Sequence, residues 1–172
     1  MERVGCDEVK ALHGLMSRVW AGLEDKSLFA VEDLDEEWIR ERLSDGGFGV
    51  VAKTPEGEIA GMLLVCCYGE TDENLGHDLS YPPEALAQVC NFEIAAVEPK
   101  HRGHGLQARM IAFAEECLRG TPIRVMAMTV SPYNEPSLRS ARKAGFRVVL
   151  TKNKYGGMLR HVLTKPLPPK EA

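Results

Sequence analysis

The sequence predicts a single mixed α/β domain that spans residues 1–172, for two reasons. The chain has 172 residues, a length that suits one hydrophobic core, and its 44% hydrophobic and 27% charged residues are ordinary for a globular protein. Two helical patterns come first, and strand and helix patterns then follow in the order αα-ββ-βα-βα-ββ. This interleaving is typical of a mixed sheet flanked by helices.

Two helices are predicted in the first part of the chain. Residues 7–23 carry apolar side chains at helical spacing, with Asp7 as the expected N-cap, and a second, short helix starts near Asp35 and ends at Gly46-Gly47. Residues 24–37 are rich in Asp and Glu, which indicates either a solvated surface or a negative rim that attracts a cationic amine. The apolar positions of the two helices are Val9, Leu12, Leu15, Met16, Val19, Leu23, Trp38, Ile39 and Leu43.

A β-hairpin and a long connection are predicted next. Residues 48–53 and 59–68 have strand patterns, and the segment 54–58 has the composition of a turn between them. Residues 70–88 lack a strand pattern and contain only a short helical piece near 84–86. Long connections inside a compact domain are often functional, so this segment either covers the substrate side of a site or is a surface excursion.

The rest of the chain alternates strands with helices. The predicted strands are 89–98, 123–130, 146–151 and 158–164, and the predicted helices are 105–118 and 135–143. Pro136 suits the first turn of the second of these helices. In the central strand, 89–98, simple alternation separates two faces, one with Asn91, Glu93, Ala95 and Val97 and the other with Phe92, Ile94 and Ala96.

Residues 97–107 join the central strand to the next helix through a basic turn that contains glycines. The first turn of a helix exposes backbone N–H groups without an intrahelical partner, and the helix dipole favours an anion there. Gly103 and Gly105 let the backbone approach a ligand, and the basic residues at 100–102 add cationic donors. The turn predicts a phosphate or pyrophosphate site, although glycines also serve turn geometry alone. Its spacing fits neither a P-loop nor a dinucleotide fingerprint, which needs a third glycine where Ala108 stands.

The same turn resembles the cofactor-binding motif of the GNAT superfamily of acetyl-CoA-dependent N-acetyltransferases, [RQ]-x-x-G-x-[GA] after a V-x-P strand end. Val97 and Pro99 match the strand end, and the motif here is Arg102-Gly103-His104-Gly105-Leu106-Gln107. Gln107 departs from the family pattern, which has Gly or Ala at this position. Its longer side chain either crowds the pyrophosphate or donates a hydrogen bond to it.

A second motif of this family follows at the expected distance. The residues that match N-x-x-[AS] and a later G-F pair are Asn134, Ser137, Gly145 and Phe146. Ala141 stands where the family has a tyrosine. The resemblance is strong over residues 47–165 and implies a mixed, mostly antiparallel sheet that splays open at the central strand and holds acetyl-CoA in the V-shaped gap.

The resemblance also implies which residues bind acetyl-CoA. Backbone groups of Ala95, Ala96 and Val97 would pair with the pantetheine arm like an added strand. Asn134 would hydrogen-bond the pantetheine, with Ser137 beside it. The residues that would hold the pyrophosphate are Arg102, Gly103, His104, Gly105, Leu106 and Gln107. No metal is implied.

Acetyl transfer to an amine needs a base for the amine proton, a hydrogen-bond donor to the thioester oxygen and an acid for the departing thiolate. Glu93 is the predicted base, because it interrupts an apolar strand where burial raises a carboxyl pKa; the alternative is a rim carboxylate paired with Lys or Arg. Since Ala141 replaces the family's acid, Tyr133 and Tyr155 are the candidate acids. The alternatives are a solvated loop aromatic for Tyr133 and a structural turn residue for Tyr155.

Composition narrows the partners and the location. The five cysteines show no metal-ligand or C-x-x-C spacing, so we expect them to be reduced and mostly buried. The net charge of −4 argues against nucleic acid as the main partner. No apolar run reaches the ~18–20 residues of a membrane span, and residues 1–8 contain no apolar signal region, so the expected location is the cytoplasm. The expected assembly is a monomer or homodimer.

These observations predict a GNAT-like N-acetyltransferase that moves the acetyl group of acetyl-CoA to a primary amine by direct attack in a ternary complex. The acceptor is a small molecule or a protein amine, and the acidic segment 24–37 favours a cationic one. The alternative is a non-catalytic CoA-binding or protein-interaction module on the same fold, which the alanine at position 141 supports.

Overall fold

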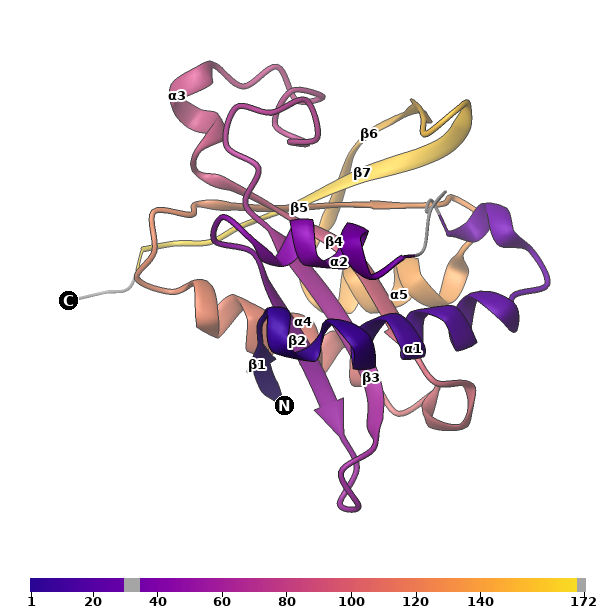
Figure 1. Ribbon diagram of the computed structural model, residues 1–172. Coiled ribbons are helices and arrows are strands. Elements are labelled where there is room, and N and C mark those ends of the chain that lie inside the picture. Colours follow the sequence, from indigo (N-terminus) through magenta and orange to yellow (C-terminus); the bar gives the residue numbers. More distant parts are fainter. Residues whose placement is uncertain (30–34, 170–172) are drawn as a thin grey trace.

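A seven-stranded sheet in the order β1-β2-β3-β4-β5-β7-β6 runs through the molecule (Figure 1). The computed structural model describes residues 1–29 and 35–169. Neighbouring strands are antiparallel except β4 and β5, which are parallel. The strands are β1 (Glu2–Val4), β2 (Phe48–Lys53), β3 (Ile59–Cys66), β4 (Val89–Val97), β5 (Val125–Val130), β6 (Arg147–Lys154) and β7 (Met158–Pro166).

Helices cover both faces of this sheet, with α1 and α2 in front of it in Figure 1 and α4 and α5 behind it. The helices are α1 (Val9–Ala21), α2 (Glu36–Leu43), α3 (Pro83–Leu86), α4 (Leu106–Leu118) and α5 (Glu135–Lys143), and the 3-10 turns are η1 (Cys6–Glu8), η2 (Lys26–Leu28) and η3 (Pro99–His101). The mixed, mostly antiparallel sheet flanked by helices confirms the predicted fold class. Among the described residues no helix is both long and apolar enough to span a membrane.

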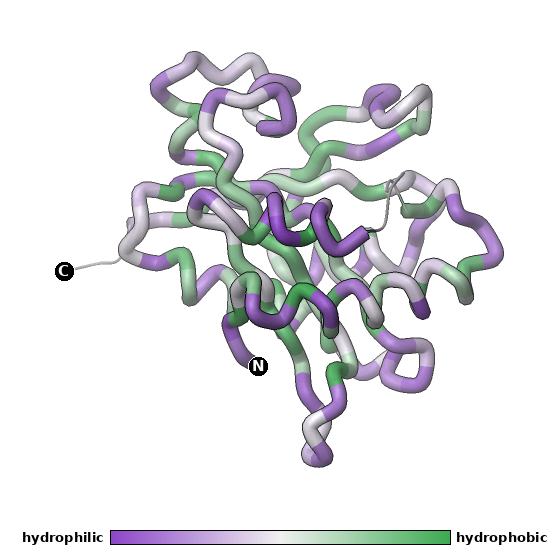
Figure 2. Tube along the Cα trace, in the orientation of Figure 1, coloured by the Kyte–Doolittle hydropathy of each residue, from purple (hydrophilic) through white to green (hydrophobic). Residues whose placement is uncertain are grey.

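Two apolar clusters fill the space between the sheet and its helices, and Figure 2 shows apolar segments through the interior with polar ones at the turns. The first cluster joins α4 and α5 to the sheet through residues such as Met110, Leu138 and Phe146. The second joins α1 and α2 to the opposite face through residues such as Leu12 and Ile39. The apolar residues that recur at helical spacing in the sequence therefore form one stripe on each of these helices, and this stripe is buried against the sheet.

Several element ends differ from the predicted ones. The Asp7 side chain does not cap α1 but accepts a hydrogen bond from the backbone N–H of Gly5 at 3.3 Å. Asp35 caps α2 by accepting a hydrogen bond from the Trp38 N–H at 2.7 Å, which agrees with the predicted start of this helix near Asp35. Strand β1 is missing from the prediction because three residues at a sheet edge are too short to show alternation. Strand β6 continues to Lys154, three residues beyond the predicted end of this strand at residue 151.

The connection after β3 is packed against the molecule rather than projecting from it. Leu75 is buried with Val89 and Ala127, and the Asn91 side chain accepts a hydrogen bond from the Leu75 N–H at 3.3 Å. Asp78 accepts from Lys152 at 2.7 Å and also from Lys154, which ties the connection to β6.

The sheet opens between β4 and β5. Their parallel pairing covers only Val89–Asn91 on β4 and Val125–Ala127 on β5, although β4 continues to Val97 and β5 to Val130. Beyond these pairs the two strands diverge, and the edge of β4 that faces β5 has no strand partner within residues 1–29 and 35–169. This opening is the splay that the resemblance implies.

Candidate functional site

The opening between β4 and β5 leads into a cavity of about 590 Å³ that residues from several elements line. Its volume falls in the range typical of small-molecule sites. The wall includes the second half of β4, the start of α4, the end of β5, the first turns of α5, and residues before and within α2. The sequence-predicted site residues on this wall are Glu93, Ala95, Ala96, Val97, Arg102, Gly103, Gly105, Leu106, Gln107, Tyr133, Asn134, Ser137 and Tyr155.

A β-bulge at Glu93 shapes the middle of β4 and corrects the predicted alternation of this strand. Leu64 pairs with Ile94, but the next residue of β3, Val65, pairs with Phe92, so Glu93 is the extra residue. Phe92 therefore packs on the side of α4 and α5, together with Ala95 and Val97, whereas Ile94 packs with α1 and α2. The prediction placed Phe92 and Ile94 on one face, and it was wrong because a bulge shifts the alternation by one residue.

The turn between β4 and α4 has the backbone geometry of an anion site. Gly103 and Gly105 have φ values of 82° and 70°, in the left-handed region that favours glycine. A Cβ atom at either position would meet nothing within 4 Å, so the turn is open to a ligand. Gly105 is the N-cap of α4. Because glycine has no side chain that could accept a hydrogen bond from the first turn, the first N–H groups of the helix remain available to a ligand.

The side chains of this turn divide into two groups. Arg102 is exposed and donates from Nε to the Val97 carbonyl at 3.1 Å, which holds its guanidinium at the rim of the cavity. His101 lines the cavity, and its buried Nε2 has no hydrogen-bond partner in the described part of the chain. His104 is exposed and does not line the cavity, so only its backbone can contribute.

Gln107 and the start of α5 meet across the cavity mouth. Gln107 Nε2 lies 3.3 Å from the Ser137 hydroxyl, to which it donates. Asn134 caps α5, with its Oδ1 accepting from the Ser137 N–H at 3.1 Å. The two family-like motifs, 27 or more residues apart in the sequence, thus come together through these three side chains.

A phosphate-bearing ligand fits this end of the cavity. The open glycine turn, the unpaired N–H groups of α4, the Arg102 guanidinium and the unpartnered His101 nitrogen all lie at one end. Each of them is a potential donor or a positive partial charge, which is what a pyrophosphate requires. The unpaired edge of β4 continues from there as backbone donors and acceptors.

Glu93 lies half-buried at the inner end of the cavity. Burial raises the pKa of its carboxyl group, and the negative charge of Glu73 adds to this rise. Arg42, Asn91 and Lys154 act in the opposite direction without cancelling it. Arg42 itself stacks on the Trp38 ring, with its guanidinium carbon 3.6 Å from the ring centroid, so it joins Glu93 to the wall that α2 provides.

Tyr155 and Tyr133 both line the cavity but differ in their surroundings. The Tyr155 hydroxyl lies 3.1 Å from the Thr129 hydroxyl, and burial together with the nearby Glu93 charge raises the pKa of Tyr155 to about 12. Its backbone has a φ of 48°, an uncommon value outside glycine, which fixes the side chain direction at the hairpin turn. Tyr133 is 74% exposed.

Ala141, at the position of the family's tyrosine, is fully buried in the α4–α5 cluster and does not line the cavity. Its neighbour Ser140 does line it. On this face of α5 the described cavity therefore meets a serine hydroxyl and no phenol.

Sequence reasoning missed six polar residues of the wall, which are Thr129, Ser131, Arg139, Ser140, Lys143 and Arg160. Arg160 is the most unusual, because only 2% of it is exposed. A signal was present, since an arginine flanked by Leu159, Val162 and Leu163 interrupts an apolar strand in the same way as Glu93 does. The other five residues give no such signal.

Comparison with known proteins identifies one family and several structures with a similar fold. The model of the acetyltransferase (GNAT) family matches residues 11–146. The fold is similar to that of yncA from Salmonella typhimurium, solved with its cofactor acetyl-CoA, at 15% identity and a TM-score of 0.73 over 99% of this chain and 95% of the other. It is also similar to the ribosomal-protein-alanine N-acetyltransferase from Brucella melitensis, at 19% identity and a TM-score of 0.72 over 96% of this chain and 98% of the other. NAA60 from Arabidopsis thaliana in complex with acetyl-CoA has 12% identity and a TM-score of 0.68 over 96% of this chain and 97% of the other. No curated protein sequence matches the chain.

Proposed function

Because the chain belongs to the GNAT family of acetyltransferases, we propose that it is an N-acetyltransferase that moves an acetyl group from acetyl-CoA to a primary amine by direct attack in a ternary complex. The observation that carries the proposal is the bulge that brings Glu93 to the inner end of a cavity whose other end is the open glycine turn. One wall of the cavity thus offers both anion-binding donors and a carboxylate of raised pKa.

The donor-binding residues follow from this arrangement. Acetyl-CoA supplies the activated acetyl thioester. Arg102, the backbone of 103–107 and the side chain of His101 would hold its pyrophosphate, and the unpaired edge at Ala95, Ala96 and Val97 would pair with its pantetheine arm. Asn134 and Ser137 would lie beside that arm. A backbone N–H on the same edge of β4 is the donor we propose for the thioester oxygen.

Glu93 would act as the base that takes a proton from the acceptor amine. A primary amine is mostly protonated near pH 7, and a carboxylate whose pKa is raised toward neutrality is a better proton acceptor than an ordinary one. Its half-buried position limits water around the charge and strengthens this effect.

Tyr155 would act as the acid for the departing thiolate. Its raised pKa keeps the phenol protonated at neutral pH, and its hydroxyl is held by Thr129 inside the cavity. Tyr133 lines the cavity too, but its ring is exposed, and no side chain of the described residues forms a hydrogen bond with its hydroxyl. These differences favour Tyr155 over Tyr133 for the role.

An assay of thiol release from acetyl-CoA against a panel of amines, with mass spectrometry of the products, tests the proposal. We expect amine-dependent release and an acetylated amine. The Arg102→Ala variant should raise the KM for acetyl-CoA about 10-fold with a smaller change in kcat, because it removes one charge-assisted contact to the pyrophosphate. Arg142→Ala, at an exposed position of α5 outside the cavity wall, is the matched control. Tight CoA binding without turnover of any amine would instead support the non-catalytic binding module.

A further inference from the structure

Arg160 is a buried arginine on the wall of the cavity. It lies on β7, is 2% exposed, and lines the cavity together with Thr129 and Tyr155. Met128 pairs with Leu163 and packs toward α4 and α5, so Thr129 and Val162, which pair with each other, face the opposite side of the sheet. Side chains alternate along a strand, and Arg160 therefore shares the face of Thr129. This is the face that α1 and α2 cover at β2, β3 and β4, whereas α4 and α5 pack on the other face.

The guanidinium of Arg160 is only partly satisfied by the described residues. It donates from Nη2 to the Ser27 carbonyl at 2.7 Å and to the Met158 sulfur at 3.2 Å, and from Nη1 to the Leu159 carbonyl at 3.4 Å. A guanidinium has five N–H donors, so these three contacts leave two without an acceptor among residues 1–29 and 35–169. Burial lowers the pKa of Arg160, but an arginine side chain remains charged in a protein.

No carboxylate of the described residues forms an ion pair with this buried charge. Asp25 attracts it only through space, because its carboxylate accepts hydrogen bonds from the Ser27 N–H at 2.9 Å and the Ser27 hydroxyl at 2.6 Å. A buried charge without a partner is costly, and one that lines a cavity is suited to pair with a ligand.

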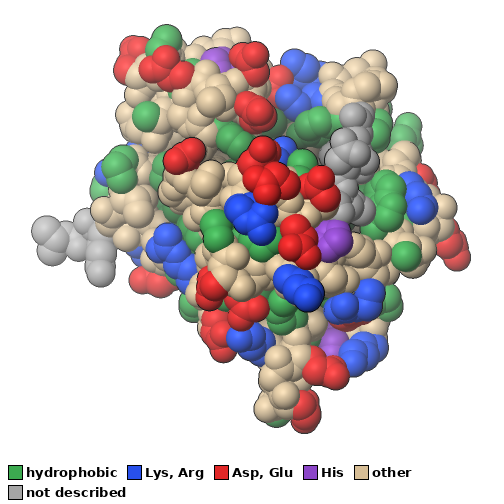
Figure 3. All heavy atoms as spheres, in the orientation of Figure 1, with side chains coloured by type: hydrophobic (Ala, Val, Ile, Leu, Met, Phe, Trp, Pro, Cys, Tyr) green, Lys and Arg blue, Asp and Glu red, His purple; other side chains and the backbone are tan. Residues whose placement is uncertain are grey.

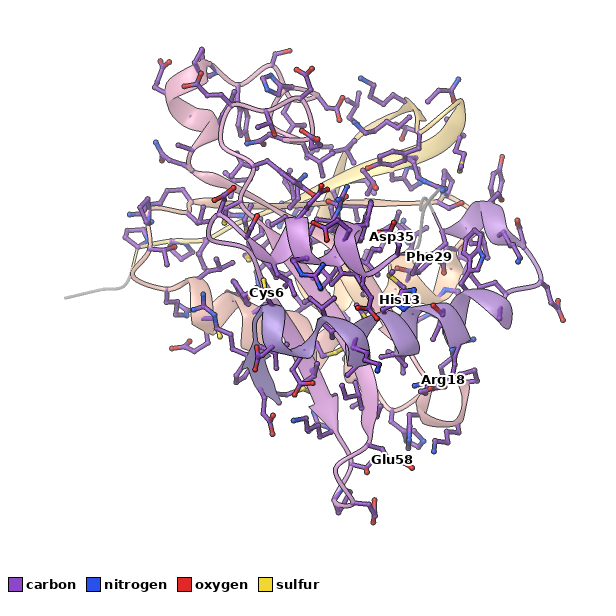
Figure 4. The ribbon with its side chains drawn as sticks, in the orientation of Figure 1. Cys6, His13, Arg18, Phe29, Asp35 and Glu58 are labelled. Atoms are coloured by element: carbon purple, nitrogen blue, oxygen red, sulfur yellow. The ribbon has the colours of Figure 1, made fainter. Side chains whose placement is uncertain are left out.

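The surroundings of Arg160 connect it with the reaction centre. Its charge acts on Tyr155, and the charge of Glu93 acts on Tyr155 in turn, so the three side chains lie within electrostatic range along one side of the cavity. Leu28 and Phe29, from the segment between α1 and α2, and Trp38 of α2 add apolar wall there (Figure 4 labels Phe29). Glu93 is the only acidic side chain on the wall among the described residues.

We propose that Arg160 binds a carboxylate of the acceptor, so that the acceptor is a small amino acid-like molecule with an amine and a carboxylate. This inference rests on the proposed function and names its substrate class. The amine lies toward Glu93, the carboxylate forms charge-assisted hydrogen bonds with the free N–H groups of Arg160, and an apolar side chain contacts Leu28, Phe29 and Trp38. A cationic acceptor, which the acidic segment 24–37 favours, would place like charge beside Arg160 instead; Glu32 and Asp33 of that segment lie outside the described residues.

The proposal is tested by comparing acceptors that differ only in the carboxylate. Apolar amino acids are assayed with acetyl-CoA beside their carboxamides and their decarboxylated amines. We expect the amino acid to have a kcat/KM about 100-fold above both analogues, because a site built for a polar group rejects analogues that leave its donors unpaired. An α-amine next to an amide is less basic than that of the free amino acid, so amine ionisation would favour the amide and cannot produce the preference of the amino acid over it.

The variant Arg160→Met should abolish the preference by lowering the kcat/KM of the amino acid while that of the carboxamide changes less than about threefold. The ratio is measured within one variant and is therefore independent of its folded fraction. Arg160→Lys should retain part of the preference, since it keeps the charge without the planar fork. Arg147→Gln, an exposed arginine of β6 outside the cavity wall, is the control and should leave the ratio unchanged.

Calorimetric titration of the same molecules into the protein with CoA bound separates the two proposals. Amino acid binding that depends on Arg160, without turnover of any amine, would retain the carboxylate site and overturn the proposed enzyme. Turnover of amines, amides or diamines at least as fast as of amino acids would overturn the carboxylate site and retain the enzyme. If amino acids neither bind to the protein nor are acetylated by it, the carboxylate site is overturned as well.

Discussion

At the scale of single residues, the function proposed here depends on charged side chains placed where burial is unfavourable. Glu93 and Arg160 each interrupt an apolar strand, and each lines the cavity from the α1–α2 side of the sheet. Their neighbours are already engaged: Arg42 stacks on Trp38, and Asp25 is bonded to Ser27. Such residues reduce stability, and a site for a charged substrate is a physical reason for their presence.

Glu93→Gln should lower kcat about 100-fold, because it removes the proposed base, and should leave the KM for acetyl-CoA nearly unchanged.

The Glu93→Gln variant should also raise the melting temperature by about 2–4 °C at pH 7, as expected for a stabilisation of roughly 1 kcal/mol. The raised carboxyl pKa means that folding favours the protonated form, so the wild type loses stability as pH rises from the unfolded pKa through the folded one. The gain should therefore vanish at acidic pH. An unchanged kcat would remove Glu93 as the base.

The pH dependence of kcat/KM should respond to Arg42. In the wild type, activity should rise with pH as Glu93 loses its proton. Since Arg42 makes the largest contribution that lowers the pKa of Glu93, Arg42→Met should move this rise to higher pH. Exposed Arg40, two residues away on the same helix, provides the control variant Arg40→Met, and an equal shift in both variants would contradict the assignment.

The two tyrosines can be ranked by removing one oxygen from each. Tyr155→Phe should lower kcat about 10–100-fold, because it removes the buried hydroxyl beside Thr129 that we propose as the acid. Tyr133→Phe should have the smaller effect, since its ring is 74% exposed. Steady-state kinetics of both variants with one amine would decide the ranking, and the reverse order would assign the acid to Tyr133.

At the scale of elements, the connection between β3 and β4 is a structural clamp. The sequence left two alternatives for this connection, a cover over the substrate or a surface excursion. Its residues do not line the cavity and they pack against the sheet, so neither alternative describes it. Leu75 is buried against β4 and β5, and Asp78 joins the connection to Lys152 and Lys154 of β6. The clamp thus holds the two halves of the splayed sheet on one side of the opening.

Asp78→Asn should destabilise the fold by about 1–2 kcal/mol, because it weakens two charge-assisted hydrogen bonds of a half-buried carboxylate. Burial alone would raise the pKa of Asp78, but Lys152 and Lys154 hold it below its usual value. Its contribution is therefore present above the unfolded pKa, ~3.9, and is lost as pH falls through the folded value. Denaturant unfolding at pH 7 and pH 3 measures this, and an equal difference between variant and wild type at both pH values would contradict it.

At the scale of the whole molecule, two apolar clusters on opposite faces share one sheet, so we expect the chain to unfold as one unit. The cavity lies where the sheet opens, and Figure 3 shows acidic and basic side chains interspersed over α1 and α2 on the face that covers it. Arg18 of α1 points toward the segment after β4 (Figure 4) and binds Glu98 at 2.7 Å, which joins this helix layer to the strand that carries the site. The layers therefore depend on one another for stability.

Acetyl-CoA should stabilise this unit as a whole. Thermal unfolding should show one transition, and a concentration about 100 times the dissociation constant should raise the melting temperature by about 5–10 °C, which corresponds to roughly 2.7 kcal/mol. Arg102→Ala should reduce the rise at the same ligand concentration. Differential scanning calorimetry measures both, and two separate transitions would contradict the single domain over residues 1–172.

The predicted elements were confirmed where the pattern is long and local. The hairpin of β2 and β3, the start of α2 next to Asp35, and the helices on both sides of the sheet follow from periodicity and turn chemistry. The alternation of β4 was wrong at Glu93, because a bulge depends on the register of β3 across the sheet and leaves no mark in the strand's own sequence.

The sequence by itself determined the family-like motifs and most residues that line the anion end of the cavity, because a strand, a glycine turn and a helix start are all local features. Only the tertiary structure decided that β4 and β5 part after Asn91, that Glu93 comes within electrostatic range of Arg42, and that Arg160 lines the same cavity as Tyr155. Strand pairing and burial arise from contacts between segments that are distant in sequence, and periodicity within one segment does not encode them.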